Sequence, residues 1–249
     1  MPVSRFVVLL LAPLFAFKAP IAPTTGEEVI KAMHDKYAGK WYKTMSFTQK
    51  TTMANGTVQT WYETMELPRI LRIDIAPLDS GNAALYHNDT VYSFRGGALR
   101  SARFSINPLL VLGFDVYADS VAATVRRMKT FNTDFTKVSA NTWQGRPHWV
   151  VGAAPGDSAS PQFWVDQERL LFTRMFTKSA SGAVTEYQFN KYSPIGGGWI
   201  SAEVLFFTNG QPGNKEEYTN IKIGETFLPG FFDPSKFAKR QPPAGPEQR

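Results

Sequence analysis

Residues 45–77 read MSFTQKTTMANGTVQTWYETMELPRILRIDIAP, and this stretch decides the fold. Apolar and polar side chains alternate in its first part, which is the period of a strand with one buried face. Asn55-Gly56 is a typical two-residue hairpin turn. Residues 58–67 then predict a second strand, which stops at Pro68, and residues 71–75 predict a third, which stops at Pro77. Strands joined by such short turns indicate an antiparallel meander.

The same pattern continues through most of the chain. Further strands are expected at residues 85–87, 91–94, 135–140, 148–153, 163–165, 170–177, 184–192, 199–207 and 217–223. Helices are expected in three places: after the capping box Thr25–Glu28, after Asn107-Pro108, and over residues 119–129. No repeat and no linker divides the chain. We therefore expect a mainly β (α+β) protein with a single domain over residues 23–240.

Composition excludes several classes of protein. The 249 residues carry a formal charge of +6 and include 19 Phe, 9 Tyr, 6 Trp and no Cys. So much apolar material argues against a disordered chain, and the lack of cysteine excludes a disulfide scaffold, a cysteine zinc site and a thiol nucleophile. The charge is too small and too scattered to indicate a nucleic-acid partner.

The two ends differ from the middle. Arg5 precedes an apolar run over residues 6–17, which is too short to span a bilayer but is typical of a signal peptide. We expect a signal peptide over residues 1–22, which directs export, and a disordered tail over residues 241–249. A buried N-terminal strand or helix is the alternative interpretation of the apolar run.

No motif for catalysis or metal binding stands out. Gly156-Asp157-Ser158-Ala159-Ser160 departs from the Gly-x-Ser-x-Gly turn of serine hydrolases at its last position. His34, His87 and His148 share no metal-ligand spacing. Glu63 and Glu66 fall on opposite faces of one strand, where carboxylates usually protect exposed edges. We expect no enzyme, no metal and no cofactor.

The remaining candidates for a function are apolar residues that could line a ligand-binding site. Residues 109–114 are apolar nearly all round, so a helix there must be buried on every side or cover a hydrophobic surface. A curved sheet can hold an apolar ligand on its concave face. The candidate ligand-binding residues are Trp61, Met65, Leu71, Ile73, Ile75, Leu109, Leu110, Leu112, Phe114, Trp164, Phe172 and Phe206. By composition alone, a filled core explains them better than a cavity does.

Several short motifs, taken in order, resemble the LolA/LolB lipoprotein-localisation superfamily. They are residues 46–50 after an amphipathic helix, 71–77, 87–92, 107–110, 145–147, 163–166 and 220–234. The resemblance covers about residues 27–237, and the order and spacing of the motifs carry it. It implies a strongly curved antiparallel sheet that forms an incomplete barrel, with helices packed in its concave side. Residues 109–114 would then belong to a lid.

The resemblance also implies a function. A carrier of this family shields the acyl chains of a lipoprotein in the periplasm, with an inner-membrane donor and an outer-membrane acceptor as partners. We therefore expect a monomeric, non-enzymatic chaperone of outer-membrane biogenesis that binds a lipoprotein, a lipid or another hydrophobic ligand. A protein–protein sensor or envelope-assembly module of the same fold, without lipid cargo, is the alternative.

Two departures from the family pattern matter. The carrier has an arginine directly before the strand-ending proline that helps to latch the lid, and this position is Leu67 here, with Arg69 and Arg72 nearby. This difference puts the ATPase-coupled opening cycle of the carrier in doubt, although not the cavity. The acceptor is anchored through an N-terminal cysteine, which this sequence lacks, so we expect a soluble protein after signal cleavage.

Overall fold

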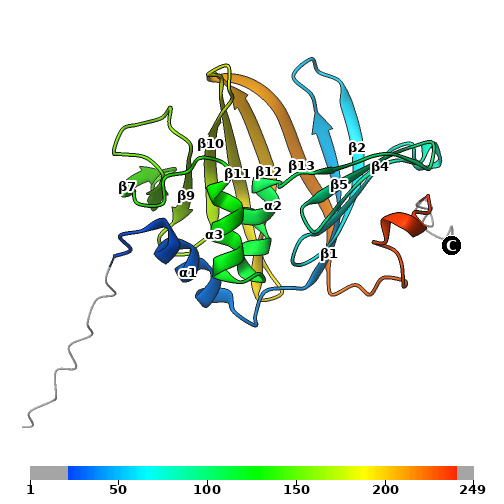
Figure 1. Cartoon of the computed structure of the whole chain (residues 1–249), viewed down its shortest axis with the longest axis horizontal. Helices are drawn as coiled ribbons and strands as arrows, with labels where there is room; N and C mark the ends of the chain where they lie inside the picture. Colours follow the sequence, from blue (N-terminus) through cyan, green and yellow to red (C-terminus); the bar gives the residue numbers. More distant parts are fainter. Residues whose placement is uncertain (1–21, 240–249) are drawn as a thin grey trace, which may run out of the picture.

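The computed structural model describes residues 22–239. The predicted tail, and all but the last residue of the predicted signal peptide, lie outside the described residues. Within them, the protein consists of one large antiparallel sheet and three α-helices (Figure 1).

The sheet contains 13 strands in the order β6-β5-β4-β3-β2-β1-β13-β12-β11-β10-β9-β8-β7. Their bounds are β1 Thr44–Thr52, β2 Val58–Glu66, β3 Ile70–Ile75, β4 Asn82–His87, β5 Thr90–Arg95, β6 Ala98–Phe104, β7 Val138–Trp143, β8 Arg146–Val151, β9 Gln162–Asp166, β10 Phe172–Lys178, β11 Val184–Ile195, β12 Gly198–Thr208 and β13 Gln211–Ile223. Two meanders, β1 to β6 and β7 to β13, join where the first strand pairs with the last. The edges β6 and β7 remain apart, so the predicted incomplete barrel is confirmed.

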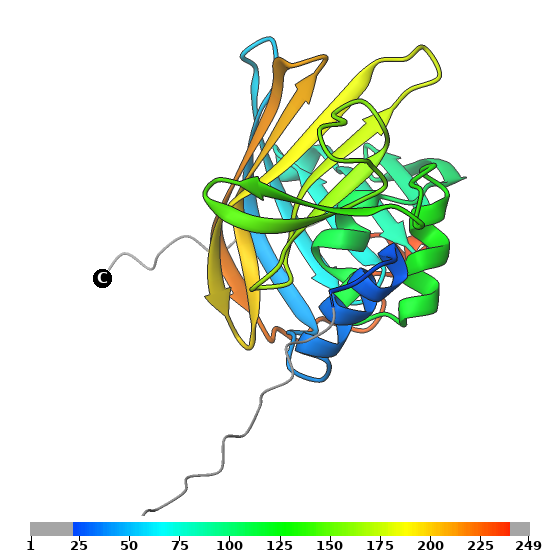
Figure 2. The ribbon, with the colours of Figure 1, turned by 90° about the vertical axis from the view of Figure 1, so that its left-hand side faces the viewer.

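The helices begin as the sequence predicts. Thr25 caps α1 (Gly26–Tyr37) and forms the reciprocal capping box with Glu28. Asn107 caps α2 (Pro108–Gly113), and Ser120 caps α3 (Val121–Lys129). All three helices lie on the concave side of the curved sheet (Figure 2). None of the helices in residues 22–239 is long and apolar enough to cross a membrane.

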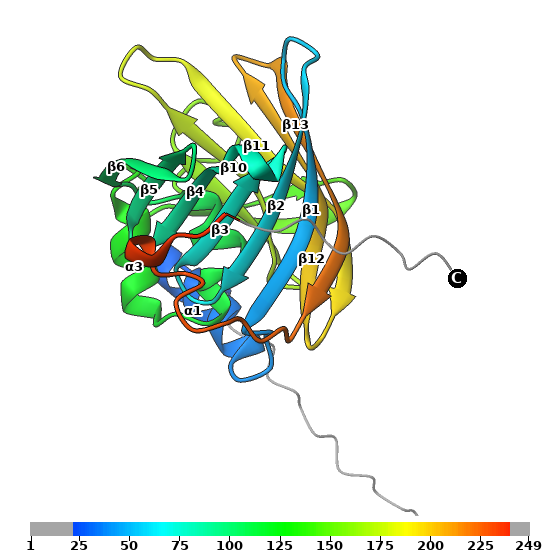
Figure 3. The same cartoon turned by 90° about the vertical axis from the view of Figure 1, so that its right-hand side faces the viewer.

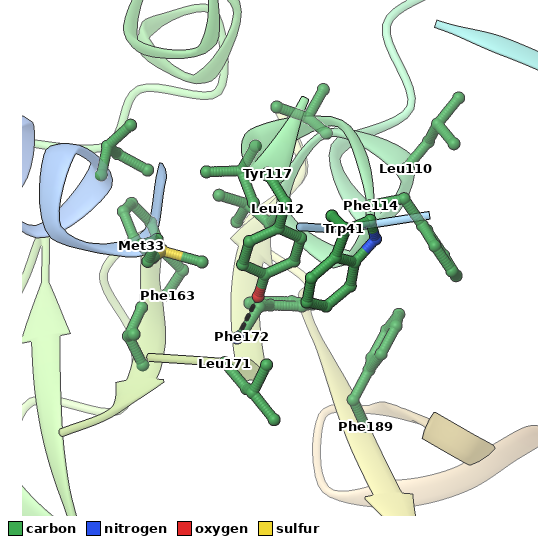
Figure 4. Packing of buried hydrophobic residues seen from close by; sticks show 14 of the residues in the cluster. Met33, Trp41, Leu110, Leu112, Phe114, Tyr117, Phe163, Leu171, Phe172 and Phe189 are labelled. Carbon is green, nitrogen blue, oxygen red and sulfur yellow. Dashed lines mark hydrogen bonds between the residues drawn. The ribbon is translucent and has the colours of Figure 1, made fainter. Parts of the chain in front are cut away.

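The main core fills the space between the helices and both meanders of the sheet. Met33 on α1 and Leu112 on α2 are fully buried there with Phe163 on β9 and Phe172 on β10. In Figure 4 these side chains converge from the helices and the strands. Burial of each such side chain contributes about 1.5–3 kcal/mol, so this layer holds the helices in the sheet.

The convex side of the first meander is covered by the chain after β13. A second buried cluster joins Leu85 and Phe94 of the sheet to Phe232 of this segment. Arg72 holds the segment in place, because its guanidinium donates hydrogen bonds to the carbonyls of Phe231 (3.1 Å) and Ala238 (2.6 Å). Figure 3 shows the segment crossing β3 and β4 on the outside of the sheet.

The structure adds one strand to those predicted and moves another. Strand β6 has no counterpart in the predicted set, because all seven of its residues are exposed and show no apolar alternation. Strand β7 begins at Val138 rather than at residue 135, since Phe135 packs instead into the core beside Phe163.

Candidate functional site

A cavity of about 360 Å³ opens on the concave face where the two meanders meet. Strands β1 to β4 form one wall, β11 to β13 form the other, and residues 105–114 close one side. The lining residues are Phe47, Gln49, Trp61, Glu63, Met65, Leu71, Ile73, Tyr86, Ser105, Ile106, Asn107, Pro108, Leu109, Leu110, Phe114, Tyr187, Phe189, Phe206, Glu216 and Tyr218. Most of them are apolar or aromatic, which is typical of a site for a small hydrophobic ligand.

Cross-strand pairing explains why these side chains share one face. Trp61, Glu63 and Met65 alternate along β2. Residues directly opposite one another in antiparallel strands point to the same side of the sheet. Glu63 lies opposite both Phe47 on β1 and Ile73 on β3, so the three strands present one continuous floor to the cavity.

Eight of the twelve candidate ligand-binding residues line the cavity. They are Trp61, Met65, Leu71, Ile73, Leu109, Leu110, Phe114 and Phe206. The structure therefore brings together residues from the first meander, α2 and β12 that are far apart in sequence. Their contact with a ligand stays a prediction.

The other four candidates lie elsewhere. Leu112 and Phe172 are fully buried in the main core. Trp164 lies in a separate cluster with Val150 and Phe176, because it occupies the opposite phase of β9 from Phe163. Ile75 is half-buried opposite Trp61, beyond the residues that line the cavity.

Ion pairs attach the helical segment, residues 108–129 with α2 and α3, to the first meander. Asp115, which follows α2 and is fully buried, accepts hydrogen bonds from the backbone N–H of Arg69 and from Arg127 Nη1, both at 2.8 Å. Arg127 Nε lies 2.8 Å from Asp89 Oδ1, and Arg69 binds Asp119 through contacts of 2.7 and 3.0 Å. Burial raises the pKa of Asp115, while the hydrogen bonds from Arg69 and Arg127 oppose that shift.

This network of ion pairs lies close to Leu67, which occupies the position of the arginine in the family pattern. The Leu67 side chain is buried in the main core and carries no charge. Arg69, two residues later, makes the charged contact with the helical segment instead. A basic residue of the turn after β2 therefore holds the segment that closes the cavity, although not the residue directly before Pro68.

The sequence argument missed two carboxylates in the cavity. Glu63, expected as an edge-protecting charge, is only 5% exposed and lines the cavity with Glu216. Tyr218 donates a hydrogen bond of 2.9 Å to Glu216. No hydrogen bond or ion pair holds the Glu63 carboxylate among residues 22–239.

Burial sets the ionisation of this pair. It raises the pKa of Glu63 well above its usual range, and the nearby charge of Glu216 raises that pKa further. Burial also raises the pKa of Glu216 to about 7, although hydrogen bonds from Tyr218 and Gln49 oppose the shift. The alternation Trp61-x-Glu63-x-Met65 was the signal that could have placed Glu63 inside, since both of its neighbours in phase were candidates.

The described residues offer few other sites for chemistry. No group of three or more His, Asp or Glu side chains within residues 22–239 is arranged to hold a metal ion. His148 is buried on β8, away from the cavity, and burial lowers its pKa. The cavity thus combines apolar walls with one pair of acids.

Comparisons with known proteins support the fold. No protein-family model and no curated protein matches the sequence. Among solved structures, a domain from Vibrio parahaemolyticus assigned to outer membrane lipoprotein sorting matches with a TM-score of 0.60 and 12% identity, over 84% of this chain and 97% of that chain. A DUF1329 family protein from Desulfovibrio piger matches with a TM-score of 0.58 and 12% identity, over 86% and 98% of the two chains.

A LolA superfamily protein from Nitrosomonas europaea is also similar, with a TM-score of 0.51 and 9% identity over 82% of this chain and 96% of that chain. Identities this low compare folds rather than activities. The protein has a LolA-like fold, as its motifs predicted, and its cavity lies where the concave sheet meets the helices.

Proposed function

We propose that the protein is a non-enzymatic carrier that shields the acyl chains of a lipoprotein, a lipid or another amphiphile in the periplasm. The observation that carries this proposal is the cavity between the sheet and residues 105–114, walled mainly by apolar and aromatic side chains. Transfer of an acyl chain from water into such a site is favourable by about 0.8 kcal/mol per CH₂. Inner-membrane donors and outer-membrane acceptors would be the partners of such a carrier.

The helical segment gives the cavity a possible route of entry. Leu109 and Leu110 line the cavity, and Asp115 follows them closely in the chain. The ion pairs of Asp119 with Arg69, and of Arg127 with Asp89, hold the helical region against the first meander, and Arg127 also binds Asp115. Leu112 on the same helix is buried in the main core with Phe172, so opening of the segment must also break these apolar contacts.

The test is binding of a fluorescently labelled acylated peptide to wild-type protein and to a variant with a filled cavity. Ile73→Trp adds bulk to the cavity floor, and we expect it to weaken binding about tenfold or more. Ile75→Trp is the matched control, because Ile75 lies on the same face of the same strand but outside the lining. The control should bind as the wild type does.

The outcomes separate the two functional hypotheses. Lipid-like molecules in organic extracts of purified protein, together with the expected order of the two variants, would support a carrier. Protein that is always empty and binds no acylated peptide would contradict it. A stoichiometric protein partner recovered without lipid would favour the sensor or assembly module instead.

A further inference from the structure

The acidic side chains of the cavity indicate which head group a bound amphiphile would have. This inference deepens the proposed function and rests on it. Glu63 projects from β2 between Phe47 and Ile73, which are its direct neighbours on β1 and β3. It is 5% exposed, and its carboxylate makes no hydrogen bond or ion pair with any residue among 22–239. Burial of a carboxylate without a partner is destabilising, so a group that supplies one would be bound favourably.

Glu216 reaches the same cavity from β13, on the other side of the seam between the meanders. It accepts a hydrogen bond from the Tyr218 hydroxyl at 2.9 Å. The described lining contains no Lys, Arg or His side chain. The two acids therefore line a cavity whose other described lining side chains carry no positive charge.

Aromatic rings surround this pair. Trp61 and Phe47 stand beside Glu63 on the floor, and Tyr187 and Phe206 line the opposite wall. The negative faces of such rings attract cations, most strongly when water is excluded. Carboxylates with aromatic neighbours suit an ammonium group and disfavour a second carboxylate.

We propose that the juxtaposition of Glu63 and Glu216 inside this aromatic cavity forms a binding site for the ammonium head of a cationic amphiphile, whose apolar chain lies against residues 106–114. A primary ammonium donates three hydrogen bonds, enough for both carboxylates, and these bonds are charge-assisted. The two acids thus select the head group while the lid residues hold the chain. A fatty acid anion would find no positively charged partner among the lining residues.

The experiment compares three ligands with the same chain. Isothermal titration calorimetry at about pH 8 measures the binding of decylamine, decanol and decanoate to the full protein. We expect decylamine to bind about tenfold or more tightly than decanol, and decanoate to bind most weakly. Glu63→Gln should remove most of the preference for the amine while binding of decanol is kept, which also shows that the variant is folded.

Glu66→Gln is the matched control, because Glu66 is exposed on the same strand with its side chain on the opposite face. It should keep the full preference for decylamine. Equal binding of all three ligands, or tightest binding of decanoate, would overturn this inference and leave the carrier intact. If none of the three binds, the proposed carrier function fails as well. Glu216→Gln provides a second variant on the other wall.

Discussion

Replacement of Glu216 by Gln should stabilise the protein, and by an amount that depends on pH. The pKa of this carboxyl rises from 4.5 to about 7 on folding, chiefly through burial. Between these two values the folded state binds the proton more tightly than the unfolded state, so the stability of the protein falls as pH rises. A shift of this size corresponds to about 3 kcal/mol at most, at 1.36 kcal/mol per pKa unit.

The amide of Glu216→Gln keeps the shape of the side chain and can still accept the hydrogen bond from Tyr218. Below about pH 4 the wild-type carboxyl is protonated, so the variant and the wild type should be nearly equally stable. Above about pH 7 the variant should be the more stable, by up to about 3 kcal/mol. Urea denaturation at a series of pH values measures the difference.

Glu217→Gln is the control on the adjacent residue of β13. A hydrogen bond from Lys215 lowers the pKa of Glu217, so its contribution is present above about pH 4.5 and is lost as pH falls. The pH dependence of stability due to Glu217 therefore has the opposite sign to that due to Glu216. The effect of the Lys215–Glu217 pair on the free energy of unfolding should stay within about 1 kcal/mol. A stability difference for Glu216→Gln that is constant with pH, or a less stable variant at about pH 8, would refute the reasoning.

Two further predictions concern stability. Arg127→Met should lower the free energy of unfolding by about 3–5 kcal/mol, because Asp115 loses a buried charged partner. Arg126 is exposed on the same helix, so Arg126→Met should change this free energy by less than about 0.5 kcal/mol. Urea denaturation measures both differences. Phe172→Ala should lower the free energy of unfolding by about 3–5 kcal/mol through loss of core packing. Leu99→Ala on the exposed strand β6 should leave this free energy almost unchanged. Equal urea midpoints for the two variants would contradict the assignment of Phe172 to the core.

The sequence predicted the parts of the fold in which one face is buried and the other is not. Strand β2 and the helix capped by Thr25 followed directly from periodicity and capping. Strand β6 could not be predicted in this way, because an exposed edge strand leaves no apolar alternation. The pairing of β1 with β13 is a long-range contact that no local pattern shows, and it was not predicted.

The site was harder to predict than the fold. Alternation identified Trp61, Met65 and Ile73 as one face, and the structure places all three on the cavity floor. It could not distinguish the two faces of β9, so Trp164 was chosen while its neighbour Phe163 points to the core. The acid pair was missed because charge was equated with exposure.

The pairing of β1 with β13 has a consequence for the folding of the chain during its synthesis. Thr219 Oγ1 bonds the carbonyl of Thr48 across 171 positions of the chain. Contacts between such distant segments form late, because closure of so long a loop costs entropy before any contact offsets it. The cavity straddles this seam, with Glu63 on one side and Glu216 on the other. The cavity of a growing chain therefore stays incomplete until β13 has been synthesised, and a ligand that touched both sides would hold the two halves of the sheet together.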